Sequence, residues 1–294
     1  MSTLRAAAVP GLARPAAYLA LTKPDVSLLV VITTLAGFYL GSRVPVDSLR
    51  MAYTVFGTSL IAGGTSALNH YFERASDACM RRTASRPLPS GQLQPAEALW
   101  FGVGLVTAGT IYLFVAVSAL PSLLALGTCV SYLGAYTPLK RRTTLATLVG
   151  AFPGAVPPLI GWAAARGTLS REAWILYAIL FLWQFPHFLA IAWMYREDYG
   201  RAGIRMLPVV EPDGRVTGQQ IIAYSLMLVP VSLLPAAMGI SGRVYLVSAA
   251  ILSLLFLASS IRAAMSKSNQ HARQLLLASV LYLPLLFAVM VLNR

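Results

Sequence analysis

The most informative stretch of this sequence spans residues 69–91 and reads Asn69-His-Tyr-Phe-Glu73-Arg-Ala-Ser-Asp77-Ala-Cys-Met-Arg81-Arg82-Thr-Ala-Ser-Arg86-Pro-Leu-Pro-Ser-Gly91. It crowds carboxylates and arginines against the end of an apolar segment that begins near residue 50. A charged side chain in hydrocarbon costs roughly 2.5 to 3.5 kcal/mol on insertion scales, so such a residue usually faces a cavity, a partner or a ligand. The stretch therefore predicts the end of a membrane span with a binding site beside it.

Composition indicates a membrane protein. Hydrophobic residues make up 57% of the 294 positions and charged residues 11%, and the mean hydropathy is +0.69. These values predict a polytopic membrane protein and exclude a soluble domain. The net charge of +13 does not indicate a nucleic-acid partner, because the basic residues lie between apolar spans rather than on a soluble basic face. Two cysteines, Cys79 and Cys129, match no metal-ligand or disulfide pattern.

Nine segments are long and apolar enough to span a bilayer, so we expect an all-α bundle of nine transmembrane helices. The segments are 24–42, 50–71, 98–119, 122–138, 144–164, 172–195, 219–239, 243–264 and 272–292. A short segment, 1–23, precedes this single membrane domain, 24–292, which leaves no room for a second, soluble domain. The long polar loops 72–97 and 196–218 are expected to cover the candidate site.

The distribution of basic residues predicts the orientation. Of the 23 Lys and Arg residues, all but six fall in alternate connections on one side. The six on the other side are Arg43, Arg50, Arg166, Arg171, Arg243 and Arg294. The positive-inside rule then places the amino terminus and both long loops in the cytoplasm and the carboxyl terminus outside. Pro10 and Arg14 interrupt any apolar core in the first 23 residues, so these do not form a cleavable signal peptide, whereas a short organellar transit segment stays an open alternative.

The first candidate site combines acidic and basic residues. Asn69, Glu73 and Asp77 recur at i, i+4 and i+8, so on one continuous helix their oxygens line a single face at intervals of about 6 Å. Such oxygens suit Mg²⁺, which is commonly held by one or two carboxylates together with substrate phosphates. Arg82 and Arg86 follow closely, and guanidinium groups bind phosphate oxygens in bidentate fashion. Salt bridges on a solvated helix end explain the same spacing equally well.

Longer motifs match a known family. Residues 69–91 resemble the first motif of the UbiA-type intramembrane prenyltransferases, and within them the protohaem IX farnesyltransferases, or haem O synthases. The likeness covers most of the chain. It continues in Leu21-Thr-Lys-Pro24, Tyr136-Thr137-Pro-Leu-Lys140-Arg-Arg-Thr143, Gly154-Ala-Val-Pro157-Pro158, Trp183-Gln-Phe-Pro186-His187-Phe, Asp198-Tyr199 and Ala202-Gly203-Ile-Arg-Met206-Leu-Pro208.

A second polar group follows the sixth expected span. Relatives that prenylate quinone precursors carry an aspartate-rich motif in this region, whereas this chain has Gln184, His187 and Asp198. If the helix continues, these three side chains and Met194 fall within roughly an 80° arc and form one wall. An imidazole there could ligate haem iron, bind a propionate or transfer a proton, and a histidine packed beside the Pro186 kink is the plain structural alternative.

The resemblance implies an activity and roles for the site residues. Haem b, farnesyl diphosphate and water would give haem O and diphosphate, for terminal oxidases. Mg²⁺ would be held by Asn69, Glu73 and Asp77, and the catalytic residues would be these three together with His187 and Asp198. The substrate-binding residues would be Arg82, Arg86, Lys140, Arg141, Tyr136, His187 and Tyr195. For Lys140 and Arg141, ordinary anchoring at the cytoplasmic membrane surface is the competing explanation.

This chain differs from the family pattern at two positions, and the resemblance also bears on the alternative functions and on the expected membrane. Ala75 stands where an aspartate is common, and Ala146 where an asparagine is common, so an accessory polar contact is expected to be missing. The rival functions are a prenyltransferase for an aromatic quinone precursor and a polytopic transporter. We expect the bilayer of the bacterial inner membrane, with the active site facing the cytoplasm, rather than the mitochondrial inner membrane. A haem A synthase or an oxidase assembly factor would be the downstream partner.

Overall fold

The computed structural model describes residues 14–42 and 45–294, and all regular elements in these ranges are helices. The expectations for Pro10 and Arg43 concern residues outside those ranges. The helices that match expected spans are α2 (Pro24–Gly41), α3 (Ser48–Ala78), α4 (Pro95–Ala116), α5 (Ala119–Ser131), α7 (Ala146–Gly154), α8 (Pro157–Arg166), α9 (Arg171–Met194), α12 (Arg215–Ala237), α13 (Arg243–Ser266) and α14 (Asn269–Leu292). Short elements connect them, namely α1 (Arg14–Leu21), the π-helical turn η1 (Tyr132–Tyr136), α6 (Thr137–Leu139), α10 (Arg196–Arg201) and α11 (Leu207–Val210).

The all-α membrane architecture is confirmed. Within the described residues, eight helical stretches are long and apolar enough to cross a bilayer, and they fall on eight of the nine expected spans. The remaining expected span, 50–71, lies within α3, a 31-residue helix that is less apolar because small and polar residues interrupt it, among them Gly63, Gly64, Thr65 and Ser66. The count of nine spans stays a prediction.

Two expected spans are not single α-helices. The span at 144–164 is divided into α7 and α8, because Pro157 and Pro158 have no N–H group to continue the hydrogen-bond ladder. The span at 122–138 continues from α5 through η1 into α6; Tyr136 ends the π turn, and Lys140 follows α6. Both irregularities lie in segments that carry family motifs.

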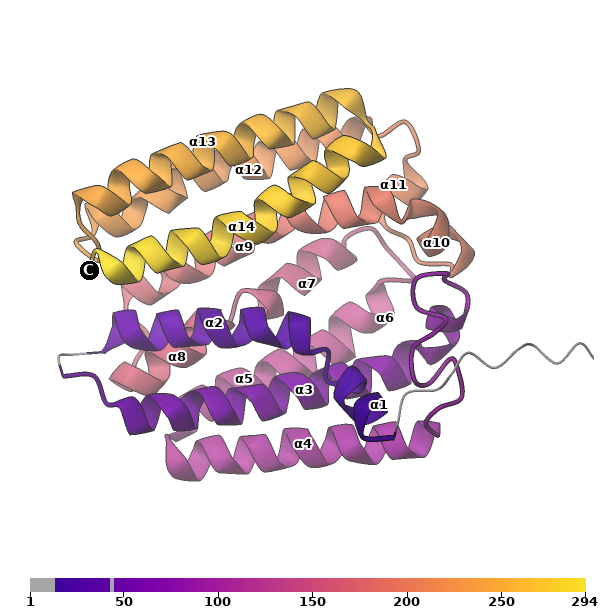
Figure 1. Cartoon of the computed structure of the whole chain (residues 1–294), viewed down its shortest axis with the longest axis horizontal. Coiled ribbons are helices and arrows are strands. Elements are labelled where there is room, and N and C mark those ends of the chain that lie inside the picture. The colour runs from indigo at the N-terminus through magenta and orange to yellow at the C-terminus, as the bar shows by residue number, and fades with distance from the viewer. Residues whose placement is uncertain (1–13, 43–44) are drawn as a thin grey trace, which may run out of the picture.

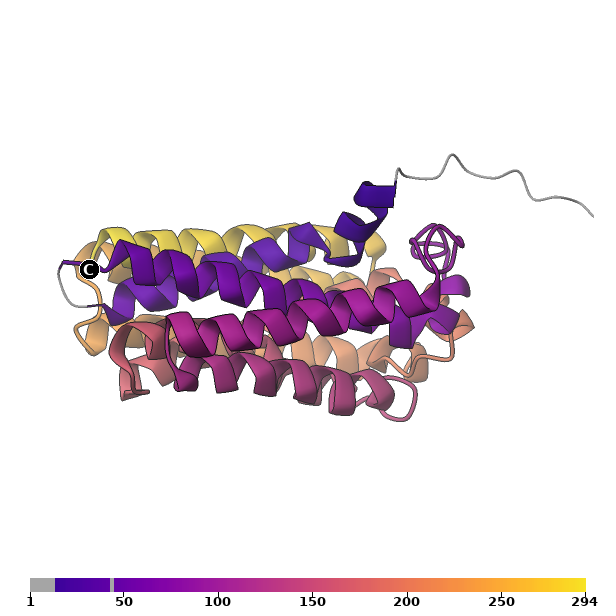
Figure 2. The same cartoon turned by 90° about the horizontal axis from the view of Figure 1, so that it is seen from below.

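The long helices lie side by side along the long axis of the molecule (Figure 1). The most extensive pairs are α3 with α4, α2 with α8, and α12 with α13, while α9 packs against both α12 and α14. Seen from below, α1 and the connection between α3 and α4 extend from the same end of the bundle (Figure 2). That end also carries α10 and α11, and the carboxyl terminus lies at the opposite end (Figure 1).

Helices α2 and α8 approach each other too closely for side chains at their crossing. A Cβ atom on Gly161 would lie 1.9 Å from the Thr34 carbonyl oxygen, and one on Gly37 would lie 2.2 Å from the Pro158 carbonyl oxygen. Both clashes are with backbone, which cannot rotate away. Glycine at these two positions therefore fixes the contact that holds α8 against α2.

Candidate functional site

The three oxygen-bearing residues of the first motif lie on one helix and each accepts a hydrogen bond from a different cation. Lys23 Nζ lies 2.8 Å from Asn69 Oδ1, and Lys140 Nζ lies 2.7 Å from Glu73 Oε1. Arg86 donates to both oxygens of Asp77, at 2.9 and 2.8 Å. Asn69 and Asp77 are buried and Glu73 is partly buried, so these contacts lie inside the protein. Salt bridges on a solvated surface therefore do not describe this helix end.

The three cations come from separate parts of the chain. Lys23 lies in the turn between α1 and α2 and has a left-handed backbone, with φ of 47°. Lys140 follows α6, and its ammonium lies 4.4 Å from the centre of the Tyr136 ring. Arg86 lies in the connection after α3, where Thr83 Oγ1 donates to the Asp77 carbonyl oxygen at 2.8 Å and holds the connection against the helix. The fold thus gathers three positive charges around one face of α3.

The sequence did not predict Lys23 as a site residue. The signal that could have found it is its place in the motif Leu21-Thr-Lys-Pro24. Burial and repulsion from Arg86 lower the pKa of Lys23 to about 7. An anion bound between these cations would favour the charged form of Lys23 and raise that pKa again.

Glu73 is held as a carboxylate. Burial raises its pKa, but the charge and hydrogen bond of Lys140 outweigh burial, so the pKa of the Glu73 carboxyl lies below its usual value. The carboxylates of Glu73 and Asp77 face three cations, which leaves an excess of positive charge. The site is therefore suited to an anion with several oxygens, such as a diphosphate.

The oxygen set fits one divalent cation of the Mg²⁺ type. Among the described residues there is no group of three or more His, Cys, Asp or Glu side chains that could hold a metal by themselves. Asn69 supplies an amide oxygen beside the two carboxylates, and its Nδ2 atom is buried without a hydrogen-bond partner in the described structure. All three oxygens already bind positive groups. Mg²⁺ commonly takes one or two carboxylates and completes its shell with water and substrate phosphates, so this incomplete set is adequate.

The single polar wall expected on α9 does not form. Helix α9 ends at Met194, and Tyr195, with φ of −110° and ψ of 21°, turns the chain into the separate helix α10, so Asp198 lies on another helix. Gln184 donates to the carbonyl oxygens of Ala151 and Leu180, which ties α9 to α7. His187 instead contacts α14. Gln184 is thus a packing residue in this structure, and His187 and Asp198 contact different elements.

His187 is oriented by Ser279 on α14. Its Nδ1 lies 2.7 Å from Ser279 Oγ, and that hydroxyl also donates to the Leu276 carbonyl oxygen at 2.6 Å. Because a hydroxyl has one hydrogen, His187 Nδ1 must carry a proton and donate to Ser279. The imidazole also stacks on Trp183, with ring centres 4.8 Å apart. In the neutral ring, the lone pair is therefore on Nε2.

Asp198 joins α10 to the connection after α3. It is buried, its carboxylate pairs with Arg201, and its Oδ2 accepts from the Arg82 backbone N–H at 3.3 Å. The Arg82 guanidinium lies 4.9 Å from the centre of the Tyr195 ring and 6.0 Å from that of Tyr199. Beside them is a cavity of about 450 Å³, which we call the arginine hollow. It is lined by Arg81, Arg82, Met194, Tyr195, Glu197, Asp198 and Arg201.

Arg141, Ala75 and Ala146, the remaining positions discussed from the sequence, make no contact with Asn69, Glu73 or Asp77 in the hydrogen bonds and ion pairs of the described residues. Arg141 is exposed, and the carbonyl oxygen of its neighbour Arg142 accepts a hydrogen bond from the Arg205 guanidinium at 3.5 Å. Ala75 is exposed and Ala146 is buried at the start of α7, so an aspartate at 75 would point to solvent or ligand rather than into the core. These positions do not interrupt the Asn69, Glu73 and Asp77 arrangement.

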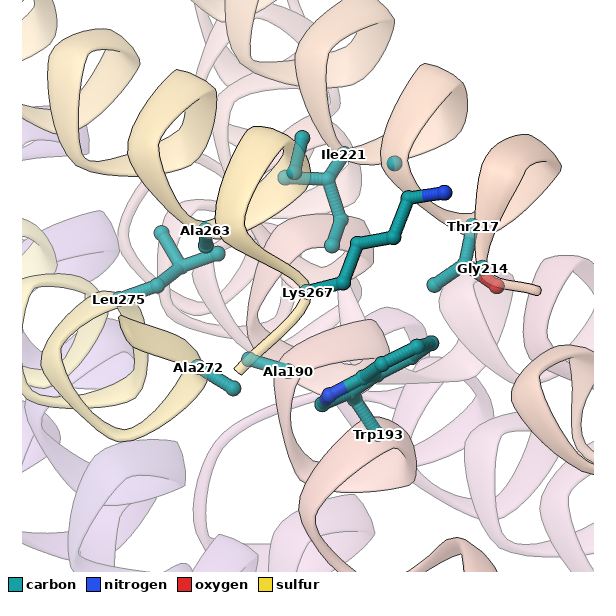
Figure 3. A pocket seen from close by; sticks show the side chains of 11 residues that line it. Ala190, Trp193, Gly214, Thr217, Ile221, Ala263, Lys267, Ala272 and Leu275 are labelled. Carbon is teal, nitrogen blue, oxygen red and sulfur yellow. The ribbon is translucent and has the colours of Figure 1, made fainter. Parts of the chain in front are cut away.

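A separate, much smaller cavity of about 10 Å³ lies between α9, α12, α13 and α14 (Figure 3). Trp193 lies across it, and Gly214 faces the indole at a distance where a Cβ atom would lie 2.4 Å from the ring. Lys267 reaches over it and donates to the Asp213 carbonyl oxygen at 2.7 Å. Its size admits no more than about one water molecule, so it is a packing defect rather than a substrate site.

Comparison with known proteins decides the family. A model described as the UbiA prenyltransferase family matches residues 30–288. The chain belongs to the UbiA prenyltransferase family. It is accordingly a prenyltransferase, as the motifs predict. Curated relatives named protoheme IX farnesyltransferase include one from Solibacter usitatus, 52% identical and covering 94% of this chain and 98% of the relative. Another from Koribacter versatilis is 47% identical and covers 94% of this chain and 93% of the relative.

Solved structures of UbiA-family proteins share the fold. A digeranylgeranylglyceryl phosphate synthase superposes with a TM-score of 0.76 at 17% identity, covering 95% of this chain and 98% of the other. A UbiA homologue from Archaeoglobus fulgidus, bound to DMAPP and Mg²⁺, superposes with a TM-score of 0.63 at 15% identity, covering 93% and 98%. At these identities the likeness establishes the UbiA fold alone.

Proposed function

We propose that this UbiA-family enzyme is a protohaem IX farnesyltransferase, which converts haem b, farnesyl diphosphate and water to haem O and diphosphate. The observation that carries the proposal is the 52% identity, over 94% of the chain, to a relative of that name. The site supports it with a cation-rich end of α3 for a diphosphate and a histidine with its Nε2 lone pair available. Quinone-precursor prenylation is disfavoured because the second aspartate motif is replaced by Gln184, His187 and Asp198.

The donor is bound by its diphosphate. The diphosphate oxygens would accept hydrogen bonds from Lys23, Arg86 and Lys140, which would give up part of their hydrogen bonds to the side chains of α3. Arg82 would donate to the diphosphate as well. Negative charge grows on the diphosphate as the allylic C–O bond breaks, so fixed cations at this place lower the barrier. Mg²⁺, held by Asn69, Glu73 and Asp77, would neutralise further charge on the leaving diphosphate when bound.

The acceptor reacts through a vinyl group. Its terminal carbon forms a bond to C1 of the farnesyl group, the C1–oxygen bond breaks, and the diphosphate leaves with that electron pair. Water then adds its oxygen to the inner vinyl carbon and loses a proton, which gives the hydroxyl of haem O. We assign His187 to the haem, with Nε2 facing the iron or a group near it, and Tyr136, Arg141 and Tyr195 to the walls of the substrate site.

The cellular setting follows from the same proposal. The integral membrane location is supported by eight apolar helical stretches in the described residues. We propose the bacterial inner membrane, with the α3 site facing the cytoplasm because the basic connections gather there. The product would pass to a haem A synthase or an oxidase assembly factor.

Pigment analysis in cells tests this function. The chain would be expressed in a bacterial host that lacks its own haem O synthase, and membrane haems would be extracted and separated. Appearance of haem O, absent from the empty-vector control, is the expected result. Haem b alone, despite membrane-inserted protein and a working positive control enzyme, would count against the proposal.

A further inference from the structure

The arginine hollow lies beside the donor site, and of its arginines only Arg82 is also assigned to the donor diphosphate. Lys23, Arg86 and Lys140 bond to Asn69, Asp77 and Glu73, whereas Arg81, Arg82 and Arg201 line the hollow. Met80, one residue before Arg81, is buried with Ala202 and Ile204, which docks the connection after α3 onto the segment after α10. The two groups of cations are therefore held next to each other by one connection.

The hollow already shows how it binds a carboxylate. The guanidinium of Arg201 pairs with the Asp198 carboxylate, and the same carboxylate accepts from the Arg82 backbone N–H at 3.3 Å. Asp198 is buried at 7% exposure, so its charge positions Arg201 without being open to solvent itself. Arg81 and Arg201 are exposed at the rim. Guanidinium groups bind carboxylates in bidentate geometry. Arg81, and Arg201 with 38% of its side chain still exposed beside Asp198, are positioned at the rim to bind a further anion.

The chemistry of the two substrates distinguishes the two groups of cations. Farnesyl diphosphate carries one anionic group, for which the donor site suffices. Haem b carries two propionate carboxylates at one edge of a large apolar ring. A volume of about 450 Å³ with a tyrosine wall from Tyr195 is in the size range of ligand sites and can admit that edge.

We propose that the arginine hollow binds the propionates of the haem acceptor, with Arg81 and Arg201 as the binding residues and Asp198 as the residue that positions Arg201. This inference rests on the proposed function, since it names the anchor of that reaction's acceptor. It assigns Asp198 a role through Arg201 and not at the reacting carbons. The same guanidinium groups could instead hold a lipid phosphate, and the test separates these two sources.

The test uses the full-length protein in nanodiscs of neutral lipid. Haem b and its dimethyl ester are titrated by absorbance, and initial rates are measured against each substrate. For the wild type we expect the free acid to bind about tenfold or more tighter than the ester, as charge-assisted hydrogen bonds predict. In R81Q/R201Q we expect this ratio to fall towards one and the KM for haem b to rise about tenfold, while the KM for farnesyl diphosphate stays within about twofold.

Matched variants guard against misfolding. R81K/R201K keeps the charge and should recover part of the ratio, and R262Q removes an exposed arginine on α13 and should change nothing. An unchanged acid-to-ester ratio in R81Q/R201Q would overturn the inference while leaving the farnesyl transfer intact. Equal binding of acid and ester by the wild type, with affinity reduced only by anionic lipid, would assign the hollow to lipid phosphate. Absence of any haem O from the wild type would refute the proposed function instead.

Discussion

Glu73 and Lys140 form an ion pair between segments 67 residues apart, and both side chains are largely buried. Replacing Glu73 by Gln keeps the shape of the side chain but removes the charge that faces Lys140. We expect kcat/KM to fall by about a hundredfold or more, as for loss of a group that acts on developing charge. The Mg²⁺ concentration needed for half-maximal rate should also rise, which a metal titration of initial rates will measure.

Asp77→Asn should behave in the same way, since Asp77 is the carboxylate partner of Arg86. Glu97→Gln is the matched control, because Glu97 caps the first turn of α4 away from the three site cations. Full activity of both site variants at ordinary Mg²⁺ concentration would contradict the assignment of these oxygens to the metal.

Ser279 tests the orientation of His187 without removing the imidazole. Ser279→Ala deletes the oxygen that accepts from Nδ1, so the ring loses its fixed tautomer. We expect the KM for haem b to rise severalfold, by the roughly 1 kcal/mol that one hydrogen bond contributes, with little change for farnesyl diphosphate. Steady-state rates against each substrate provide the measurement. An equal effect on both substrates would indicate a packing role for the pair.

The sequence predicted which side chains share a helix face where all of them lie on one helix. Asn69, Glu73 and Asp77 lie on one face because their spacing is local to α3. Lys23 and Gln184 could not be placed in this way, because their partners Asn69 and Ala151 are set by packing between helices. The spacing of residues along one helix cannot predict which residues of another helix will contact them.

At the scale of elements, the contact between α2 and α8 depends on glycine. Gly161→Ala would push a Cβ atom into the Thr34 carbonyl, so we expect a loss of about 1 to 3 kcal/mol in stability, typical of overpacking. Thermal unfolding in detergent will report this as a lower midpoint. Gly104→Ala on α4 is the control, since a Cβ there meets nothing within 4 Å and alanine favours helix. Equal midpoints for the two variants would mean that α2 and α8 separate easily.

The end of α9 is an element boundary that the sequence pattern predicts only in part. Apolar length predicted the span at 172–195 well, and α9 covers Arg171–Met194. The condition for a single wall, one helix that continues to Asp198, is not met, because Tyr195 ends the helix without a proline or glycine to signal it. The partners of Asp198 lie at Arg82, 116 residues away along the chain, and at Arg201. Tertiary contacts, and not local propensity, end α9 there.

At the scale of the whole molecule, hydropathy and charge predicted the membrane bundle, and α1, the end of α3, α10 and α11 lie at one end of it (Figure 1). We expect this end to face the cytoplasm. Alkaline phosphatase and fluorescent protein fused after Arg294 will test the prediction, since only the first is active outside the cytoplasm. Fluorescence of the fusion at Arg294 would show that the carboxyl terminus is cytoplasmic. The predicted orientation would then be wrong, and the site would face away from cytosolic farnesyl diphosphate.

The most direct test of the central claim is a competition between acceptors. Purified protein with Mg²⁺ and farnesyl diphosphate would receive equal concentrations of haem b and an aromatic quinone precursor, and the products would be identified by mass spectrometry with diphosphate release measured in parallel. Haem O formed together with an equal amount of diphosphate, and no prenylated aromatic product, is the result that we predict. A prenylated aromatic acid with haem b left unchanged would contradict the account.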